Sequence, residues 1–196
     1  MSPSAKFSFD AMVSLLREFT PRPEIVLEEV PAPQKLAQYS FAFTADLSNG
    51  VIGEGEDELA SGRFVILHEP GGQETWEGEF RCVTFMRATV DSEMQEDPLL
   101  PEVGWNWLLD SLQESDALYS APSGTVTRVS SASFGKLSSR LDQSEIEIRA
   151  SWSPILTSPS ELIPHAQAWC NFISEVAGLP PLQEGVASLN AARRRG

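Results

Sequence analysis

The first part of the chain has the spacing of an amphipathic helix. Apolar side chains recur at intervals of three and four residues, at Phe9, Met12, Val13, Leu16 and Phe19. Ser8 precedes them as a helix N-cap, and Thr20-Pro21 follows them as a stop signal. The pattern therefore predicts a helix over residues 9–19.

Four segments with the pattern of β-strands follow, over residues 25–30, 39–44, 63–68 and 76–85. The second and the fourth alternate apolar and polar side chains, which gives each strand one face to bury. In the fourth, this alternation places Trp76 on the inward face. The third is apolar on both faces, as in a central strand. Pro31 and Pro33 place the first at an edge or a strand end. The turn residues Pro70-Gly71-Gly72 predict that the last two segments form a hairpin.

A second helix is predicted from Pro101-Glu102 to about residue 113. Its inward stripe consists of Trp105, Leu108, Leu109 and Leu112. Val103 and Trp107 fall on the other side of this helix, about 160–200° from Trp105. A helix with apolar residues on both sides either lies between two layers or offers one side to a partner.

Two further strands and a closing helix complete the pattern. Residues 125–131 alternate weakly, whereas residues 146–152 alternate cleanly between a dry and a wet face. Ser158-Pro159-Ser160-Glu161 has the composition of a capping box. An apolar stripe follows it, at Leu162, Ala166, Trp169, Ile173 and Val176. Pro164 predicts a late start or a distorted first turn for this helix.

The order of elements is therefore helix, four strands, helix, two strands, helix. Grouped strands joined by short turns favour an α+β fold with a mainly antiparallel sheet, which leads us to expect about six strands and about three helices. A chain of 196 residues suits one domain, which we place at residues 1–184. We expect residues 185–196, including Arg193–Arg195, to be a flexible tail.

The net charge and the two cysteines limit which binding partners and which cellular location we expect. The formal net charge of −14 predicts repulsion from bulk nucleic acid and from anionic membranes. The acidic runs at 53–58 and 91–98 are expected in solvated loops. No apolar run is long enough to span a membrane, and the first residues lack the pattern of a secretory signal. Cys82 and Cys170 lie in apolar surroundings typical of reduced, buried thiols, so we expect a cytoplasmic protein.

The sequence offers few candidates for catalysis or ligand binding. The spacings of its two histidines and two cysteines match no metal motif, and the common nucleotide-binding loops are absent, so we expect neither metal nor cofactor. His68, Arg128 and Ser130 are possible ligand-binding residues. Trp107, with Val103, is a candidate partner-binding residue, since an exposed tryptophan is a typical interface anchor. Burial of Trp107 against the loop after residue 113 is the alternative.

Arginines recur in the strand patterns, at Arg81, Arg87, Arg128 and Arg149. If their faces coincide, they form a basic patch suited to an anionic ligand. The interpretation we prefer at this point is cross-strand pairing with Glu77, Glu79 and Glu147 on a solvated sheet face.

The sequence resembles a known family in segments spread over nearly the whole chain. They are PRPEIVLEEVPAPQKLA at 21–37, LLPEVGWNWL at 99–108, YSAPSGTVTRVSSASFG at 119–135, EIRASWSP at 147–154 and WCNFISEVAGLPPL at 169–182. The family is the actinobacterial domain of unknown function number three thousand. The resemblance implies a stand-alone cytoplasmic protein, and it implies no activity, cofactor or catalytic residue.

Three hypotheses about function follow. The first is a non-catalytic binding or adaptor protein that acts through a protein partner or by self-association. The second is an enzyme or a small-molecule-binding protein with its site between the sheet and the helices. The third is an accessory role in RNA metabolism, which requires a local basic surface.

Overall fold

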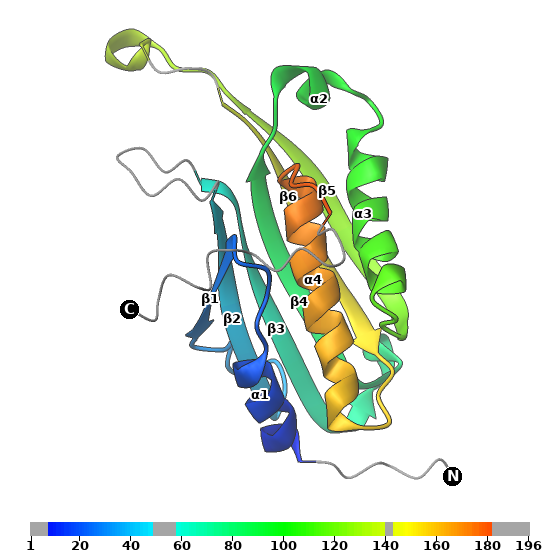
Figure 1. The fold of residues 1–196 in the computed structure, drawn as a ribbon. Helices are drawn as coiled ribbons and strands as arrows, with labels where there is room; N and C mark the ends of the chain where they lie inside the picture. The colour runs from blue at the N-terminus through cyan, green and yellow to red at the C-terminus, as the bar shows by residue number, and fades with distance from the viewer. Residues whose placement is uncertain (1–7, 49–57, 140–142, 182–196) are drawn as a thin grey trace, which may run out of the picture.

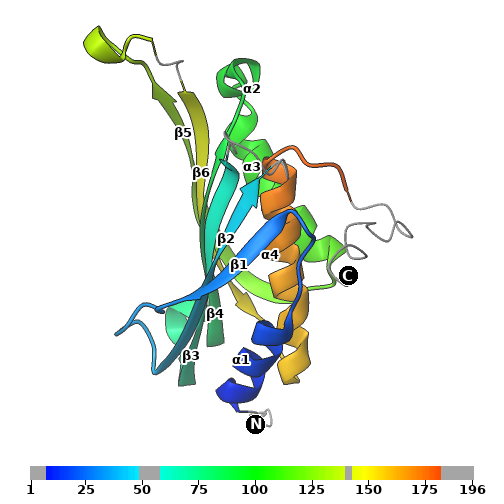
Figure 2. The ribbon, with the colours of Figure 1, turned by 60° about the vertical axis from the view of Figure 1, so that its left-hand side comes forward.

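A six-stranded antiparallel sheet forms the centre of the computed structural model, which describes residues 8–48, 58–139 and 143–181. Its elements, in chain order, are α1 (Phe9–Glu18), β1 (Ile25–Val30), β2 (Tyr39–Ser48), β3 (Glu58–Gln73), η1 (Glu74–Trp76), β4 (Gly78–Thr89), α2 (Ser92–Glu96), α3 (Leu100–Glu114), β5 (Tyr119–Ser131), η2 (Gly135–Leu137), β6 (Gln143–Pro154), η3 (Pro159–Glu161) and α4 (Leu162–Val176). Helices α1, α3 and α4 lie on one face of the sheet (Figure 1, Figure 2). Within the described residues, no α-helix covers the opposite face.

The strand order β1-β2-β3-β4-β6-β5 confirms the predicted α+β class and the predicted order of elements. β1 is an edge strand and β3 is central, as their prolines and their two-sided apolar pattern predicted. After β4 the chain passes through α3, forms β5 at the other edge and returns as β6 between β5 and β4. The hairpin of β5 and β6 projects beyond the rest of the sheet (Figure 2).

The core lies between the sheet and α4. The rings of Phe43 in β2, Phe64 in β3 and Trp169 in α4 are almost fully buried, with centroids 5.2–5.4 Å apart. Nε1 of Trp169 donates a hydrogen bond of 2.7 Å to Oγ1 of Thr84 in β4. The polar atom of this indole is therefore satisfied inside the core. Successive side chains of a strand point to opposite faces, so this face buries one alternate set of strand residues.

The helices follow the predicted stripes with some shifts. Ser8 caps α1, because its Oγ accepts a hydrogen bond of 3.1 Å from the backbone N of Asp10. In α3, Leu108 and Leu112 are fully buried as predicted, whereas Trp105 and Leu109 are only half-buried.

The predicted turn at residues 70–72 was wrong. β3 continues to Gln73, and the chain reverses through η1, with Glu77 in the left-handed region at φ 56°. Gly71 and Gly72 have φ values of 99° and 77° and accompany a register shift within the β3–β4 pair. The glycines therefore form an irregularity inside the strand and not its end. Trp76 consequently lies in η1 and packs on the helix-free face, although the alternation predicted it inward.

Two further predictions need correction. The acidic run at 91–98 contains the short helix α2, whose first turn is capped by Oδ1 of Asp91 at 2.7 Å from the backbone N of Met94. Ser158 makes no capping hydrogen bond. The carboxylate of Glu161 instead accepts hydrogen bonds from the backbone N and Oγ1 of Thr157. A 3-10 turn precedes α4, which matches the distorted start that Pro164 predicted.

Some of the remaining predictions concern residues that the structure describes, and others concern residues outside the described ranges. Cys82 and Cys170 are buried free thiols, as expected. The tail at 185–196 and most of the acidic run at 53–58 lie outside the described residues. Among the described helices, none combines the length and the apolar character needed to cross a membrane.

We expect the substitution Gly124→Ala to destabilise the fold by about 2 kcal/mol, because an added methyl group would overlap its neighbours and force them to shift. A Cβ at position 124 in β5 would lie 2.5 Å from the backbone O of Arg149 and 2.8 Å from the ring of Trp105. Gly78→Ala is the matched control, since a Cβ there meets nothing within 4 Å. Urea unfolding measures both variants. Equal stabilities would contradict the close approach of β5 to β6.

Candidate functional site

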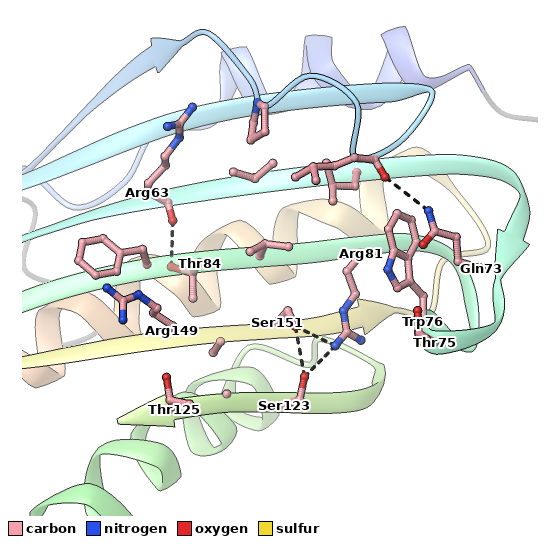
Figure 3. Close-up of a pocket in the computed structure, with 18 residues that line it drawn as sticks. Arg63, Gln73, Thr75, Trp76, Arg81, Thr84, Ser123, Thr125, Arg149 and Ser151 are labelled. Carbon is pink, nitrogen blue, oxygen red and sulfur yellow. Dashed lines mark hydrogen bonds between the residues drawn. The ribbon is translucent and has the colours of Figure 1, made fainter. Parts of the chain in front are cut away.

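The helix-free face of the sheet carries a groove of about 780 Å³ (Figure 3). Val65 and Leu67 of β3 and Val83 of β4 form its apolar floor. Trp76 of η1 and Leu36, from the segment between β1 and β2, lie along one side. Val65 and Leu67 are at most 6% exposed. They belong to a small second apolar cluster, which lies beneath the groove on this face.

The polar residues of the groove lie at alternate positions of four strands. β3 contributes Arg63 next to Val65 and Leu67, and β4 contributes Arg81 and Phe85 on either side of Val83. In register, Leu67 lies opposite Arg81 and Arg63 lies opposite Phe85.

The β5–β6 ladder completes the groove. Ser123 of β5 lies opposite Ser151 of β6, and Thr125 lies opposite Arg149. Each of these side chains is two residues from its neighbour on the same strand, and so they share one face. The polar end of the groove is therefore formed by β5 and β6.

Arg81 is the centre of a buried hydrogen-bond network (Figure 3). The residue is only 7% exposed. Its Nη1 donates to the backbone O of Ala121 at 2.8 Å and to Oγ of Ser153 at 3.0 Å. Its Nη2 donates to Oγ of Ser123 at 3.0 Å and to Oγ of Ser151 at 2.8 Å. Ser153 in turn donates to the backbone O of Trp76, which ties the wall of the groove to this network.

The charge of Arg81 has no ion-pair partner in the part of the chain that the structure describes. All four of its hydrogen-bond acceptors are neutral, and among the described residues no carboxylate lies within ion-pair distance of its guanidinium. Burial lowers the pKa of Arg81, with small opposing contributions from Cys82 and Glu77. A buried charge is normally paired, because removing it from water is costly.

Two more arginines line the groove. The guanidinium of Arg149 lies over the ring of Phe85, 5.1 Å from its centroid, and its contact with Glu147 is 3.4 Å long. Nη2 of Arg63 donates to the backbone O of Pro31, whereas its buried Nε finds no hydrogen-bond partner among the described residues. None of the described residues that line the groove is acidic, although the chain carries a net charge of −14.

The preferred interpretation, cross-strand pairing with Glu77, Glu79 and Glu147, is met in kind by Arg87 but not with those partners. Arg87 lies between Glu58 of β3 and Glu145 of β6, at 4.0 and 3.8 Å. Arg81 shares that sheet face but contacts serines in place of Glu77 or Glu79. Arg128 lies on the other face, where its Nη1 donates to the backbone O atoms of Gln95 and Asp97. Arg63 was missed.

The other candidate ligand-binding residues do not share a pocket. His68 lies on the helix-covered face, where its ring stacks on Phe80 at 4.3 Å and burial lowers its pKa. Arg128 and Ser130 belong to β5, in the part that pairs with residues 144–146 of β6. His68 pairs instead with Phe80 near the start of β4, toward the opposite end of the sheet.

The candidate partner-binding residues are partly accessible. Val103 is 38% exposed on α3, and Leu99, just before that helix, is 58% exposed. Trp107 is half-buried and packs against the main core. A partner role for Val103 and Trp107 stays a prediction.

Comparison with known proteins identifies the family. A family model described as "Protein of unknown function (DUF3000)" matches residues 5–187. The chain belongs to the DUF3000 family. The match covers nearly the whole chain and confirms the resemblance found in the sequence. No curated protein and no solved structure matches this DUF3000 chain. In the part of the chain that the structure describes, no cluster of His, Cys, Asp and Glu side chains could hold a metal ion.

We expect His165 to make folding pH-dependent. This fully buried histidine accepts a hydrogen bond of 3.0 Å at Nδ1 from Nε1 of Trp152, and burial lowers its pKa from 6.5 to about 4. The unfolded chain therefore binds a proton at a higher pH than the folded one. The contribution of the neutral His165 to the free energy of unfolding is fully present above pH 6.5. It is lost as the pH decreases to about 4, and the loss is about 3 kcal/mol at most.

Urea unfolding of the wild type and of His165→Gln across this pH range measures the effect. The glutamine retains an acceptor for Trp152 but does not titrate. The difference in stability between the two proteins should shrink or reverse as the pH falls. A difference that stays constant with pH would contradict the burial of a neutral imidazole.

We expect Arg81→Gln to destabilise the protein by about 2 kcal/mol, because several buried oxygens lose their donor. Arg87→Gln is the matched control on the same face of β4, and its exposed ion pairs should contribute less than about 0.5 kcal/mol. Thermal unfolding followed by circular dichroism compares them. The hydrogen-bond network would be refuted if both variants melted alike.

Proposed function

We propose that this protein is a non-catalytic binding protein whose partner occupies the groove on the helix-free face. One observation carries the proposal. The described lining of the groove combines an apolar floor with three arginines, and it contains no His, Cys, Asp, Glu, Lys or Tyr. Concave sites with apolar walls and a few converging polar groups are typical of ligand binding. Proton transfer near neutral pH needs a side chain of a kind that this lining lacks.

The packing on the helix-covered face also favours a binding function over a catalytic one. Between α4 and the central strands the space is filled by buried side chains, among them Trp152, Trp169 and Phe172. His165, which lies among them, is held neutral by burial and hydrogen-bonded to Trp152. We also propose a cytoplasmic location, for which the two buried free thiols are the supporting observation.

Affinity capture from the native host tests the proposal. The bait is the full chain, and the readout is the set of proteins and small molecules that it retains, identified by mass spectrometry. Val83→Trp fills the floor of the groove, and Val26→Trp makes the same change at a 64% exposed position of β1 outside the groove. Trp107→Ala tests the surface of α3. Circular dichroism confirms that each variant folds.

We expect Val83→Trp to lose what the wild type retains, and Val26→Trp and Trp107→Ala to keep it. Retention by a folded Val83→Trp variant would overturn the groove as the binding site. Loss in Trp107→Ala alone would instead assign binding to α3, where Val103 and Leu99 are exposed.

A further inference from the structure

The groove has a polar end and an apolar end. At the polar end, the β5–β6 ladder places Ser123, Thr125, Arg149 and Ser151 on one face, with the guanidinium of Arg81 beside the two serines (Figure 3). The guanidinium of Arg149 is directed away from the serines, over the ring of Phe85 and toward Glu147. At the apolar end lie Val65, Leu67 and Trp76. Two strand spacings, about 10 Å, separate β6 from β3. A ligand that fills the groove therefore needs two chemically different parts.

The serine hydroxyls are set up to donate hydrogen bonds into the groove. Oγ of Ser123 and Oγ of Ser151 each accept a hydrogen bond from Nη2 of Arg81. The two oxygens lie 3.3 Å apart, so their mutual contact uses at most one hydroxyl proton. At least one proton is therefore left for a ligand. Donation from a guanidinium polarises these hydroxyls and makes them stronger donors.

The charge at this end is positive and incompletely neutralised. Arg81 is buried among neutral acceptors. The side chain of Arg149 is 61% exposed, and its 3.4 Å contact with Glu147 is a surface ion pair, which is worth little. An anion placed here supplies a counter-charge that the described lining of the groove does not contain, and guanidinium and hydroxyl donors suit carboxylate or phosphate oxygens.

The apolar end suits a small hydrocarbon or aromatic body. Its floor is formed by buried Val65 and Leu67 with half-buried Val83, and Trp76 and Leu36 bound it on the side. The volume of about 780 Å³ lies within the usual range of small-molecule sites. A bounded groove of this size favours a compact ligand over a long polymer.

We propose that the groove binds a small amphipathic anion. Its carboxylate or phosphate head accepts hydrogen bonds from Ser123 and Ser151 beside the charge of Arg81, and the exposed side chain of Arg149 turns from Glu147 toward it. Its apolar body lies across Val83 toward Trp76. This inference rests on the proposed binding function of the groove and names the chemistry of its ligand.

Calorimetric titration with simple probes tests the inference. Octanoate and octyl phosphate carry both parts of the proposed ligand and distinguish the two head groups. Octanol lacks the charge, inorganic phosphate lacks the apolar body, and octyltrimethylammonium reverses the charge. We expect one or both amphipathic anions to bind at least about tenfold more tightly than the other three, since a charged hydrogen bond contributes about that factor.

Matched variants locate the bound probe. Arg149→Gln should weaken binding about tenfold. Arg87→Gln, two residues beyond Phe85 on the same face and outside the groove lining, should leave it unchanged. Octanoate with a bromine on its last carbon should quench tryptophan fluorescence in the wild type, and Trp76→Phe should abolish that quenching without abolishing binding.

Three results would overturn the inference. One is equal binding of octanol and the amphipathic anions, and another is equal weakening by Arg149→Gln and Arg87→Gln. The third is tight, groove-dependent binding of a single-stranded oligonucleotide or an acidic peptide, with no binding of the amphipathic anions. If no probe binds while capture from the host still depends on Val83, this inference fails and the proposed binding function stands.

Discussion

The contact of Trp169 with the centre of the sheet is the interaction on which the rest of the structure depends. Its indole packs against Phe43 and Phe64 and donates to Thr84, so α4 is fixed across the three central strands β2, β3 and β4. A buried tryptophan contributes a large apolar area, and a satisfied N–H removes the cost of burying its polar atom. The helices consequently gather on one face, and within the described residues no α-helix covers the other face (Figure 2).

The groove is a consequence of this one-sided arrangement. A sheet of alternating side chains that buries Phe64 and Ile66 on the helix side must direct Arg63, Val65 and Leu67 to the other side. On that side the segment between β1 and β2, together with η1, covers only part of the apolar floor. The remaining hollow is bounded by strands that contribute arginine and serine.

Arg81 connects the architecture to the proposed function. A fully exposed arginine on an acidic protein would be solvated, and a paired one would be neutralised. Arg81 is instead buried and surrounded by neutral oxygens, which hold β4, β5 and β6 together and keep a positive charge beside the groove. The same network reaches the wall residue Trp76 through Ser153, so the shape and the charge of the groove are coupled.

The sequence by itself determined the secondary structure and the fold class. Period-two alternation in β2 and β6, helical spacing in α1 and α4, and the capping of α1 by Ser8 are local properties, and they were read correctly. The turn near Gly71 was misplaced because glycine permits both a turn and an irregular strand, and only the pairing of β3 with β4 selects between them. For the same reason, the alternation pattern predicted the wrong face of the sheet for Trp76.

Only the tertiary structure decided the site. Arg81, Ser123 and Ser151 lie 28 to 70 residues apart in the chain, and the insertion of β6 between β4 and β5 brings them into hydrogen-bond contact. Arginine alternating in a strand pattern is compatible both with a surface ion pair, as in Arg87, and with a buried network, as in Arg81. Local sequence cannot separate these outcomes, because burial and the choice of partner depend on which strands become neighbours.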